Sequence, residues 1–365
     1  MSDKTIGFIG LGLIGGSIAK ALRRVHPEYR LIAYNRSRSS LVEAMSDGTI
    51  NQATDVIDAS FAECDFIFLC MPVSVNIQCL KKLKDLVPDT CVITDVGSVK
   101  STIHEAVREL GMEARFIGGH PMTGSEKTGI LSATNTLLEN AYYIITPTAL
   151  TPKEEISEFR DFVLSLGAIP LILDYKIHDY STAAISHLPH MIAYSLVNLV
   201  RQIDDDKETM KTIAAGGFKD ITRIASSSPV MWQNICASNR EPLLSLMDQY
   251  LALLTKLRGY IDSSNEQALL SFFQQAKDYR DSITLPSVKS PTVYYECFVD
   301  LVDETGGIAA VAGLLAQYHI SIKNIGIVNN REFEEGVLQL AFPDKQTLTR
   351  AKRLLKDNGY MVHER

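Results

Sequence analysis

Short apolar segments alternate with longer segments of helical periodicity through the first 174 residues. In Val75–Leu86, Ser101–Leu110 and Pro152–Leu166 the apolar residues recur three or four positions apart, the pattern of amphipathic helices. Strands joined by such helices predict a parallel, doubly wound sheet of the Rossmann type, which binds its ligands outside the carboxyl ends of the strands. The predicted strands are Thr5–Ile9, Leu31–Tyr34, Asp65–Met71, Thr90–Asp95, Arg115–Gly118, Tyr142–Thr146 and Ile169–Leu173.

The pattern changes after residue 174. Apolar residues recur at helical spacing over residues 175–280 without strand signals, which predicts an all-helical second domain. Serines and two prolines without periodicity mark a linker over residues 281–291. Residues 292–365 then follow the order strand, helix, strand, strand, helix, strand, which is typical of a small ferredoxin-like βαββαβ domain. We therefore expect an α/β protein of three domains.

The first predicted strand leads into a glycine-rich loop with Gly10, Gly12 and Gly15 at G-x-G-x-x-G spacing. In a dinucleotide-binding loop the first glycine permits a tight turn, the second lets backbone approach a pyrophosphate, and the third lets helix and strand pack closely. The helix start, with Leu13 and Ile14, would offer N–H groups to the anion. The loop therefore predicts a nicotinamide dinucleotide site, with a merely tight strand–helix turn as the alternative.

The end of the second predicted strand departs from the usual dinucleotide pattern. An acidic residue is expected there to bind the adenosine ribose, but Asn35 occupies the position and Arg36 follows it. The asparagine can bind a ribose hydroxyl, and the arginine suits either the 2′-phosphate of NADP or the adenine ring. We favour NAD, and the sequence leaves NADP open.

His120 is the candidate for the reacting group of the sheet domain. It stands in a glycine-rich stretch that starts at Gly118 and continues to Gly129, directly after the apolar pair Phe116-Ile117. The stretch predicts a loop that presents the imidazole to a ligand; a loop histidine bonded to its own backbone is the plain alternative. Ser98 follows the preceding predicted strand, so both side chains are expected at the carboxyl edge of the sheet.

Two segments of the helical domain are unusual for plain helix. His187 and His190 are three residues apart around a proline, and no carboxylate or third histidine at a matching interval indicates a metal site. We expect only one of the two histidines to contact a substrate. Lys219 and Arg223 stand four apart, which on a helix places both cations on one side, available to a carboxylate or else paired with Asp220.

Composition restricts the partners. A formal net charge of −7 and a pI near 5.7 argue against nucleic acid and against an anionic membrane surface. The six cysteines form no Cys-x-x-Cys pair, so neither a zinc site nor a disulfide framework is indicated, which fits a reducing cytoplasm. The apolar N-terminus has the length of a signal peptide, but its glycine spacing is better explained by the dinucleotide loop.

With these segments in place, the chain resembles prephenate dehydrogenases of the aromatic amino-acid pathway that carry a C-terminal ACT domain. The resemblance covers nearly the whole chain. It rests on Gly10–Ser17, Asp95–Lys100, the Gly-Gly-His-Pro-Met-Thr-Gly-Ser-Glu loop, Ser186–His190, Gly217–Ala225, and on Asp303–Ile308 and Ile320–Ile325 in the tail.

The resemblance implies a substrate and a role for each residue. Prephenate would lose a hydride from its ring carbinol and carbon dioxide from the opposite carbon, giving 4-hydroxyphenylpyruvate. His120 would be the catalytic base with Ser98 sharing the hydroxyl's hydrogen bonds, because a neutral imidazole suits proton acceptance near neutral pH. A homodimer through the helical domains is also implied. The implied substrate-binding residues are Arg223, His190, Lys219, Ser125 and Glu126.

The tail is expected to be regulatory, with L-tyrosine as its ligand. Gly306 and Gly307 would let backbone approach the amino acid, Asp303 and Ile308 belong to the same turn and helix start, and Asn324 would bind the ammonium group. A domain that only dimerises or stabilises is the alternative for the tail. For the enzyme, the alternatives are an arogenate dehydrogenase, a β-hydroxyacid dehydrogenase, or an inactive nucleotide- and amino-acid-sensing protein.

Overall fold

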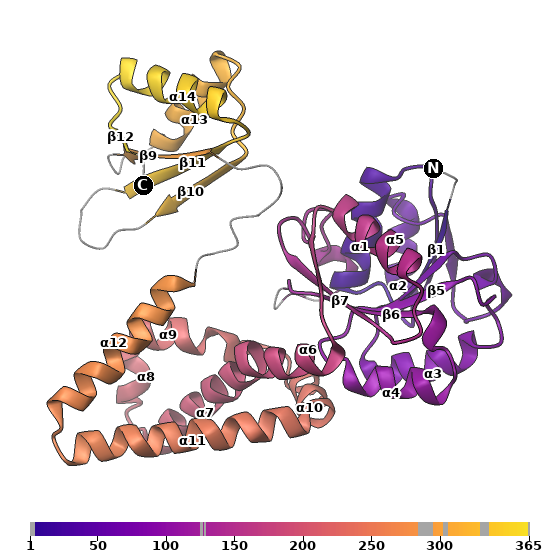
Figure 1. Cartoon of the computed structure of the whole chain (residues 1–365), viewed down its shortest axis with the longest axis horizontal. Coiled ribbons are helices and arrows are strands. Elements are labelled where there is room, and N and C mark those ends of the chain that lie inside the picture. Colours follow the sequence, from indigo (N-terminus) through magenta and orange to yellow (C-terminus); the bar gives the residue numbers. More distant parts are fainter. Residues whose placement is uncertain are drawn as a thin grey trace. The chain divides into compact units, whose positions relative to one another are not determined.

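The computed structural model describes residues 4–124, 127, 129–283, 295–301, 306–328 and 336–363. The chain forms two compact units, Met1–Ser282 and Ile283–Arg365 (Figure 1). The larger unit holds the sheet domain and the helical domain. The smaller unit is the C-terminal domain.

An eight-stranded sheet in the order β3-β2-β1-β4-β5-β6-β7-β8 forms the first part of the larger unit. β1 pairs in parallel with both β2 and β4, so the strand order reverses at β1, and the predicted Rossmann-type sheet is confirmed. The strands are β1 (Thr5–Ile9), β2 (Arg30–Tyr34), β3 (Gln52–Thr54), β4 (Phe66–Leu69), β5 (Val92–Asp95), β6 (Phe116–Pro121), β7 (Tyr142–Pro147) and β8 (Ile169–Ile172).

The prediction that all strands are parallel is wrong at β7. This strand runs antiparallel to β6, with His120 opposite Ile144. A parallel partner needs a crossover, usually through a long helix. In the described part of the connection, only the short 3-10 helix η3 (Ile130–Ser132) is formed, so the chain returns along the same edge.

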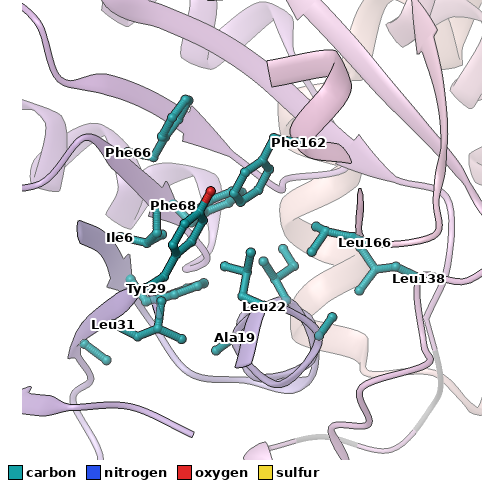
Figure 2. Packing of buried hydrophobic residues seen from close by; sticks show 14 of the residues in the cluster. Ile6, Ala19, Leu22, Tyr29, Leu31, Phe66, Phe68, Leu138, Phe162 and Leu166 are labelled. Atoms are coloured by element: carbon teal, nitrogen blue, oxygen red, sulfur yellow. The ribbon is translucent and has the colours of Figure 1, made fainter. Parts of the chain in front are cut away.

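Helices cover both faces of the sheet because the side chains of each strand alternate between them. Ile6 and Phe8 pack with α1 (Leu13–Val25), α2 (Arg38–Ser46) and α5 (Lys153–Ser165), whereas Ile9 packs with α3 (Val73–Leu83) and α4 (Ser101–Glu109) on the opposite face. Figure 2 shows side chains of the first of these clusters, among them Leu22 of α1, Phe68 of β4 and Phe162 of α5. The Phe68 and Phe162 rings lie 5.7 Å apart between centroids.

The helical domain follows β8, as predicted. Its elements are α6 (Tyr175–Thr182), the π-helical turn η4 (Ala183–His187), α7 (Leu188–Ile203), α8 (Thr209–Ile213), α9 (Gly216–Thr222), the 3-10 turn η5 (Arg223–Ser226), α10 (Pro229–Ser238), α11 (Arg240–Asp262) and α12 (Glu266–Ser282). Pro189 has no N–H for the turn before it, and a π-helical turn stands at that place.

The helix from Tyr175 to Ile203 is also long and apolar enough to cross a membrane on length and composition alone. Only 17% of its most apolar window is buried within the chain.

The smaller unit has the predicted βαββαβ order. Its elements are β9 (Tyr295–Leu301), α13 (Gly307–Gln317), β10 (Asn324–Val328), β11 (Gly336–Phe342), α14 (Lys345–Asp357) and β12 (Val362–His363). The four strands form one sheet in the order β10-β11-β9-β12, and all of its pairs are antiparallel. Val299, Val311, Leu340 and Leu355 belong to the core of this unit.

Candidate active site

The glycine loop between β1 and α1 has the close contacts that a dinucleotide-binding turn requires. Gly10 has a φ of +108°, which favours glycine, and a Cβ on Gly15 would lie 2.4 Å from the carbonyl oxygen of Gly10. By contrast, a Cβ on Gly12 would meet no atom within 4 Å. Two of the glycines are therefore required by the protein's own packing, and the second leaves open space in front of the loop.

The start of α1 is free of side-chain caps. Gly12 is the N-cap, and no side chain among the described residues accepts from the first turn. That turn, which includes Leu13 and Ile14, holds no acidic residue. Its N–H groups are thus suited to an anion. This open glycine and uncapped helix start fit the pyrophosphate of a dinucleotide.

Asn35 and Arg36 lie at the end of β2 as predicted. The Asn35 side chain has a structural role there: its Oδ1 accepts from the Leu11 N–H at 3.2 Å, and its Nδ2 donates to the Ser37 carbonyl at 3.1 Å. These bonds fix the glycine loop against the second strand. Arg36 is exposed.

His120 is not a loop residue, and the expectation that it is presented rather than buried is wrong. It lies within β6 and is only 8% exposed. The glycines before it mark close packing, because a Cβ on Gly118 would lie 2.2 Å from Thr146 Oγ1 and one on Gly119 would lie 2.6 Å from the Asp95 carbonyl oxygen. The sequence predicted a loop because glycines are also typical of loops, whereas Gly118 and Gly119 are required here by the close packing of β6.

A hydrogen-bonded chain from α6 orients the His120 ring. His120 Nδ1 lies 2.8 Å from His178 Nε2, and His178 Nδ1 lies 2.8 Å from Asp179 Oδ1. The carboxylate oxygen accepts, so His178 carries its proton on Nδ1 when neutral and accepts at Nε2 from His120 Nδ1–H. His120 Nε2 is then left with a lone pair, which is the form required of a base.

Asp179 is fixed by the helix that follows β5. Its Oδ1 also accepts from the Lys100 N–H and its Oδ2 from the Ser101 N–H, each at 2.7 Å, so it closes the N-terminus of α4. Burial alone would raise its pKa, but the bonds from His178, Ser101 and Lys100 lower the pKa of this carboxyl overall. Asp179 is therefore an ionised anchor that joins the helical domain to the sheet domain.

The surroundings of His120 keep its ring neutral. Burial lowers the pKa of His120 well below its ordinary value, and the neighbouring His178, Lys100 and His187 lower it further. Ser98 stands half-buried in the connection between β5 and α4. Since β5 and β6 are parallel neighbours, both predicted residues lie at the same edge of the sheet.

In the helical domain, the side chain of His190 is held in place. Its Nδ1 donates to the Ser186 carbonyl at 2.8 Å, and its ring stacks on Trp232 at 3.7 Å between centroids. Burial lowers the pKa of His190, and the positive charge of Arg223 adds to this, whereas the bond to Ser186 opposes it. The ring is thus expected to be neutral with Nε2 as an acceptor.

Lys219 and Arg223 do not share one α-helix. α9 ends at Thr222, and Arg223 begins a 3-10 turn. Both side chains are exposed, and no ion pair with either, including the alternative pair with Asp220, is found among the described residues. The cations are therefore available to a ligand.

His178, Asp179 and Asn239 are the site residues that sequence reasoning missed. Asn239 Nδ2 lies 2.8 Å from the Asp179 carbonyl oxygen and 3.0 Å from His187 Nδ1, and it joins α10 to α11. His187 is 1% exposed, and its Nε2 has no partner in the described parts of the chain. The adjacent pair His178-Asp179, just after a helix start, was the available signal.

Some predicted residues are outside the described part of the chain or lie in the separate C-terminal unit. Ser125, Glu126 and Asp303 lie outside the described residues. Gly306 has a φ of +97° and is the N-cap of α13, which begins at Gly307 and continues with Ile308. Asn324 is exposed at the start of β10. No group of three metal-ligating side chains is found within the described residues.

A dinucleotide that takes a hydride and an imidazole that takes a proton together define the chemistry of nicotinamide-dependent dehydrogenases acting on alcohols. Comparison with known proteins narrows this class. The model of the prephenate dehydrogenase nucleotide-binding domain matches residues 18–170, and that of the prephenate dehydrogenase dimerization domain matches residues 174–275. A prephenate dehydrogenase from Bacillus subtilis (strain 168) is 36% identical over 354 residues, which cover 96% of this chain and 95% of the relative.

Two solved structures are also similar to this chain. Prephenate dehydrogenase from A. aeolicus in complex with hydroxyphenyl propionate and NAD+ has a TM-score of 0.74 and 30% identity, covering 78% of this chain and 99% of that one. Synechocystis arogenate dehydrogenase has a TM-score of 0.69 and 31% identity, covering 77% and 100%. The chain belongs to the prephenate dehydrogenase family. The predicted enzyme class and its NAD cofactor are thereby confirmed.

Proposed function

We propose that this enzyme converts prephenate to 4-hydroxyphenylpyruvate, with NAD accepting the hydride and carbon dioxide leaving the ring. The observation that carries the proposal is the chain Asp179–His178–His120, which leaves His120 Nε2 as a proton acceptor at the carboxyl edge of the sheet. His120 takes the proton of the ring hydroxyl as the hydride departs and returns it to that oxygen when loss of carbon dioxide makes the ring aromatic, so the product keeps its hydroxyl group. Ser98 shares the hydrogen bonds of that hydroxyl.

The substrate is a dianion, and an acidic protein must hold it with local cations. Arg223 is exposed and is close enough to His190 to lower the pKa of that ring. We assign the substrate carboxylates to Arg223 and Lys219, with His190 Nε2 as a neutral acceptor beside them. Ser125 and Glu126 remain further proposed contacts, because the resemblance includes their segment.

The test is turnover of the purified full chain. NADH absorbance should rise on addition of prephenate and NAD, with 4-hydroxyphenylpyruvate as the product. Arogenate is the second substrate to try, because one similar structure is an arogenate dehydrogenase. A simple β-hydroxy acid serves as the control. Turnover of the control acid but not of prephenate would contradict the proposal, and no turnover of any of them would support an inactive sensor.

NAD is also proposed as the preferred cofactor over NADP. Asn35 carries no negative charge to repel a 2′-phosphate, and its amide is already bonded to the loop, so Arg36 decides whether a phosphate is tolerated. Comparing kcat/KM for the two cofactors tests this preference. A higher value with NADP would contradict the proposed preference for NAD.

The helical domain is proposed to form a homodimer. The matching family model describes a dimerization domain, and the long helix from Tyr175 to Ile203 is mostly uncovered within one chain. A second copy would cover apolar surface of this kind. Analytical ultracentrifugation of the full chain in detergent-free buffer should give a dimer. A monomer, or a chain that stays in the membrane fraction, would contradict this assignment.

The C-terminal unit is proposed to be an ACT domain that binds L-tyrosine and inhibits the enzyme. Gly306, which adopts its positive φ without strain, precedes α13, and the N–H groups of that helix suit the carboxylate of an amino acid, with Asp303 and Ile308 in the same segment. Asn324 would hold the ammonium group. Coupling must be reciprocal, so tyrosine should weaken prephenate binding and prephenate should weaken tyrosine binding.

A chain that ends at Ser290 tests the regulatory role. It should remain active and lose tyrosine inhibition. If the shortened enzyme is inhibited as strongly as the full chain, tyrosine competes at the active site. If neither form is inhibited, the C-terminal domain has a stabilising or dimerising role.

A further inference from the structure

Lys100 and Asp95 form an ion pair from which solvent is fully excluded. Both side chains are 0% exposed, and Lys100 Nζ donates to Asp95 Oδ2. Such a pair is a weak source of stability, because the desolvation of two charges offsets most of their attraction, and apolar residues of similar volume often stabilise a fold as well. We therefore look for the role of the pair in its position, next to the backbone that carries His120 and Ser98.

The polar atoms of the pair bind the backbone directly before each of the two site residues His120 and Ser98. Lys100 Nζ donates to the Gly119 carbonyl at 2.6 Å, and Asp95 Oδ1 accepts from the Gly119 N–H at 3.3 Å. Asp95 Oδ2 accepts from the Gly97 N–H at 2.9 Å. Gly119 directly precedes His120, and Gly97 directly precedes Ser98.

The paired registers of β5 and β6 are Ile93 with Phe116 and Thr94 with Ile117. Asp95 and Lys100 therefore bind β6 beyond the last paired residues, where side-chain bonds take the place of the strand ladder. The packing there is tight, since a Cβ on Gly119 would lie 2.6 Å from the Asp95 carbonyl oxygen. A small displacement at this point would be transmitted directly to His120.

We propose that Lys100, held by Asp95, is a positioning residue of the reaction: the pair fixes the backbone that carries His120 and Ser98, and its ammonium group places a positive charge near the His120 ring. This inference rests on the proposed function of His120 as the base. Removal of the ammonium group should displace the ring and make it easier to protonate.

The groups that act on the His120 ring come from several elements. They are His178 and Asp179 on α6, His187 on η4, and Lys100 before α4, with Asp95 at the end of β5. Among them Lys100 is the cation held against the strand that carries His120. Its loss should therefore move the acidic limb of kcat/KM to higher pH, by about 1 pH unit for one charge several ångströms away.

The experiment compares Lys100→Met with Arg115→Met in the full chain. Arg115 is a matched control because it is also buried, precedes β6, and donates to the Val87 and Lys84 carbonyls at 3.0 Å, far along the strand from His120. Lys100→Met should lower kcat roughly 10- to 100-fold, the effect of a small misplacement of a reacting group. Its NADH Kd should stay within about threefold of the parent, and its acidic limb should move upward. Arg115→Met should retain the parent kcat and pH profile and lose only thermal stability.

A second variant covers the case in which Lys100→Met fails to fold. Asp95→Asn with Lys100→Met removes both charges, so kcat should still fall while the limb moves less than in the single variant. Parent-like kcat and pH profile in either folded variant would overturn the proposal. So would loss of folding in both variants while Arg115→Met folds, because the pair would then act on stability. Absence of prephenate turnover by the parent chain would instead contradict the proposed function.

Discussion

Exchange of Asp179 for Asn is expected to reverse the proton arrangement at His120 without removing any side chain that contacts the substrate. The Asp179 carboxylate accepts three hydrogen bonds: from His178 Nδ1 and the Lys100 N–H at Oδ1, and from the Ser101 N–H at Oδ2. An amide offers only one oxygen, and its nitrogen donates. At least one of the three donors must therefore lose its acceptor.

Two orientations of the new amide are possible, and they differ in effect. If the amide nitrogen faces His178, the His178 ring must accept at Nδ1 and carry its proton on Nε2. His120 must then accept at Nδ1, so it carries its own proton on Nε2. The base is then already protonated. The corresponding exchange in a Ser-His-Asp triad lowers kcat by about 10⁴-fold for the same reason, and we expect a loss of about 10²- to 10⁴-fold here. An unsatisfied buried N–H should also lower stability by about 1–3 kcal/mol.

Steady-state NADH formation and thermal melting of Asp179→Asn test this prediction together. Asp174→Asn is the control, because the Asp174 side chain caps the same helix through the Lys176 and Ile177 N–H groups. Its backbone carbonyl accepts from the His178 N–H at 2.9 Å, and the exchange keeps that bond. The control should lose some stability and keep its kcat. If Asp179→Asn melts earlier but keeps kcat within about threefold of the control, the amide oxygen faces His178, the ring keeps its proton on Nδ1, and the predicted reversal at His120 is contradicted.

Three further predictions concern His120, Arg223 and the glycine loop. His120→Asn should lower kcat by about 10²- to 10⁴-fold with NAD binding unchanged, and near-normal kcat in this variant would exclude His120 as the base. In the parent enzyme kcat/KM should fall only below about pH 6.5, because burial lowers the pKa of the His120 ring. Arg223→Ala should raise KM for prephenate about 10- to 150-fold, as loss of a contact of about 1.5–3 kcal/mol implies, and an equal rise in KM for NAD would indicate a structural role. Gly12→Ala should keep the parent melting temperature but weaken NAD binding. Gly15→Ala should instead destabilise the fold, because its Cβ would lie 2.4 Å from the Gly10 carbonyl oxygen. Equal melting temperatures of the two variants would contradict this difference.

The sequence predicted the layers of the fold better than the direction of one strand. Apolar alternation and helical spacing are local properties, so they located β1, the glycine loop and the all-helical domain. The direction of β7 depends on how the chain returns from β6. The pattern of apolar residues within a strand does not indicate the direction of that strand. The absence of helical periodicity between Pro121 and Tyr142 was the usable sign.

The candidate site was predicted where chemistry depends on residue type and missed where it depends on contact. His120 and Ser98 follow neighbouring strands, so their common edge could be predicted. The strand conformation of His120 could not, because Gly118 and Gly119 are required by Thr146 and Asp95, which lie far from them in the sequence. His178 and Asp179 reach the site only through the docking of α6.

The closure of α4 by Asp179 also constrains the order in which the protein can assemble during its synthesis. The Lys100 N–H and its acceptor on Asp179 are separated by 79 residues, which a ribosome takes about 4 to 16 s to add at roughly 5–20 residues per second. During that interval α4 has no cap and His120 has no orienting partner. We expect the nascent sheet domain to complete its catalytic edge only when the helical domain begins to emerge and dock.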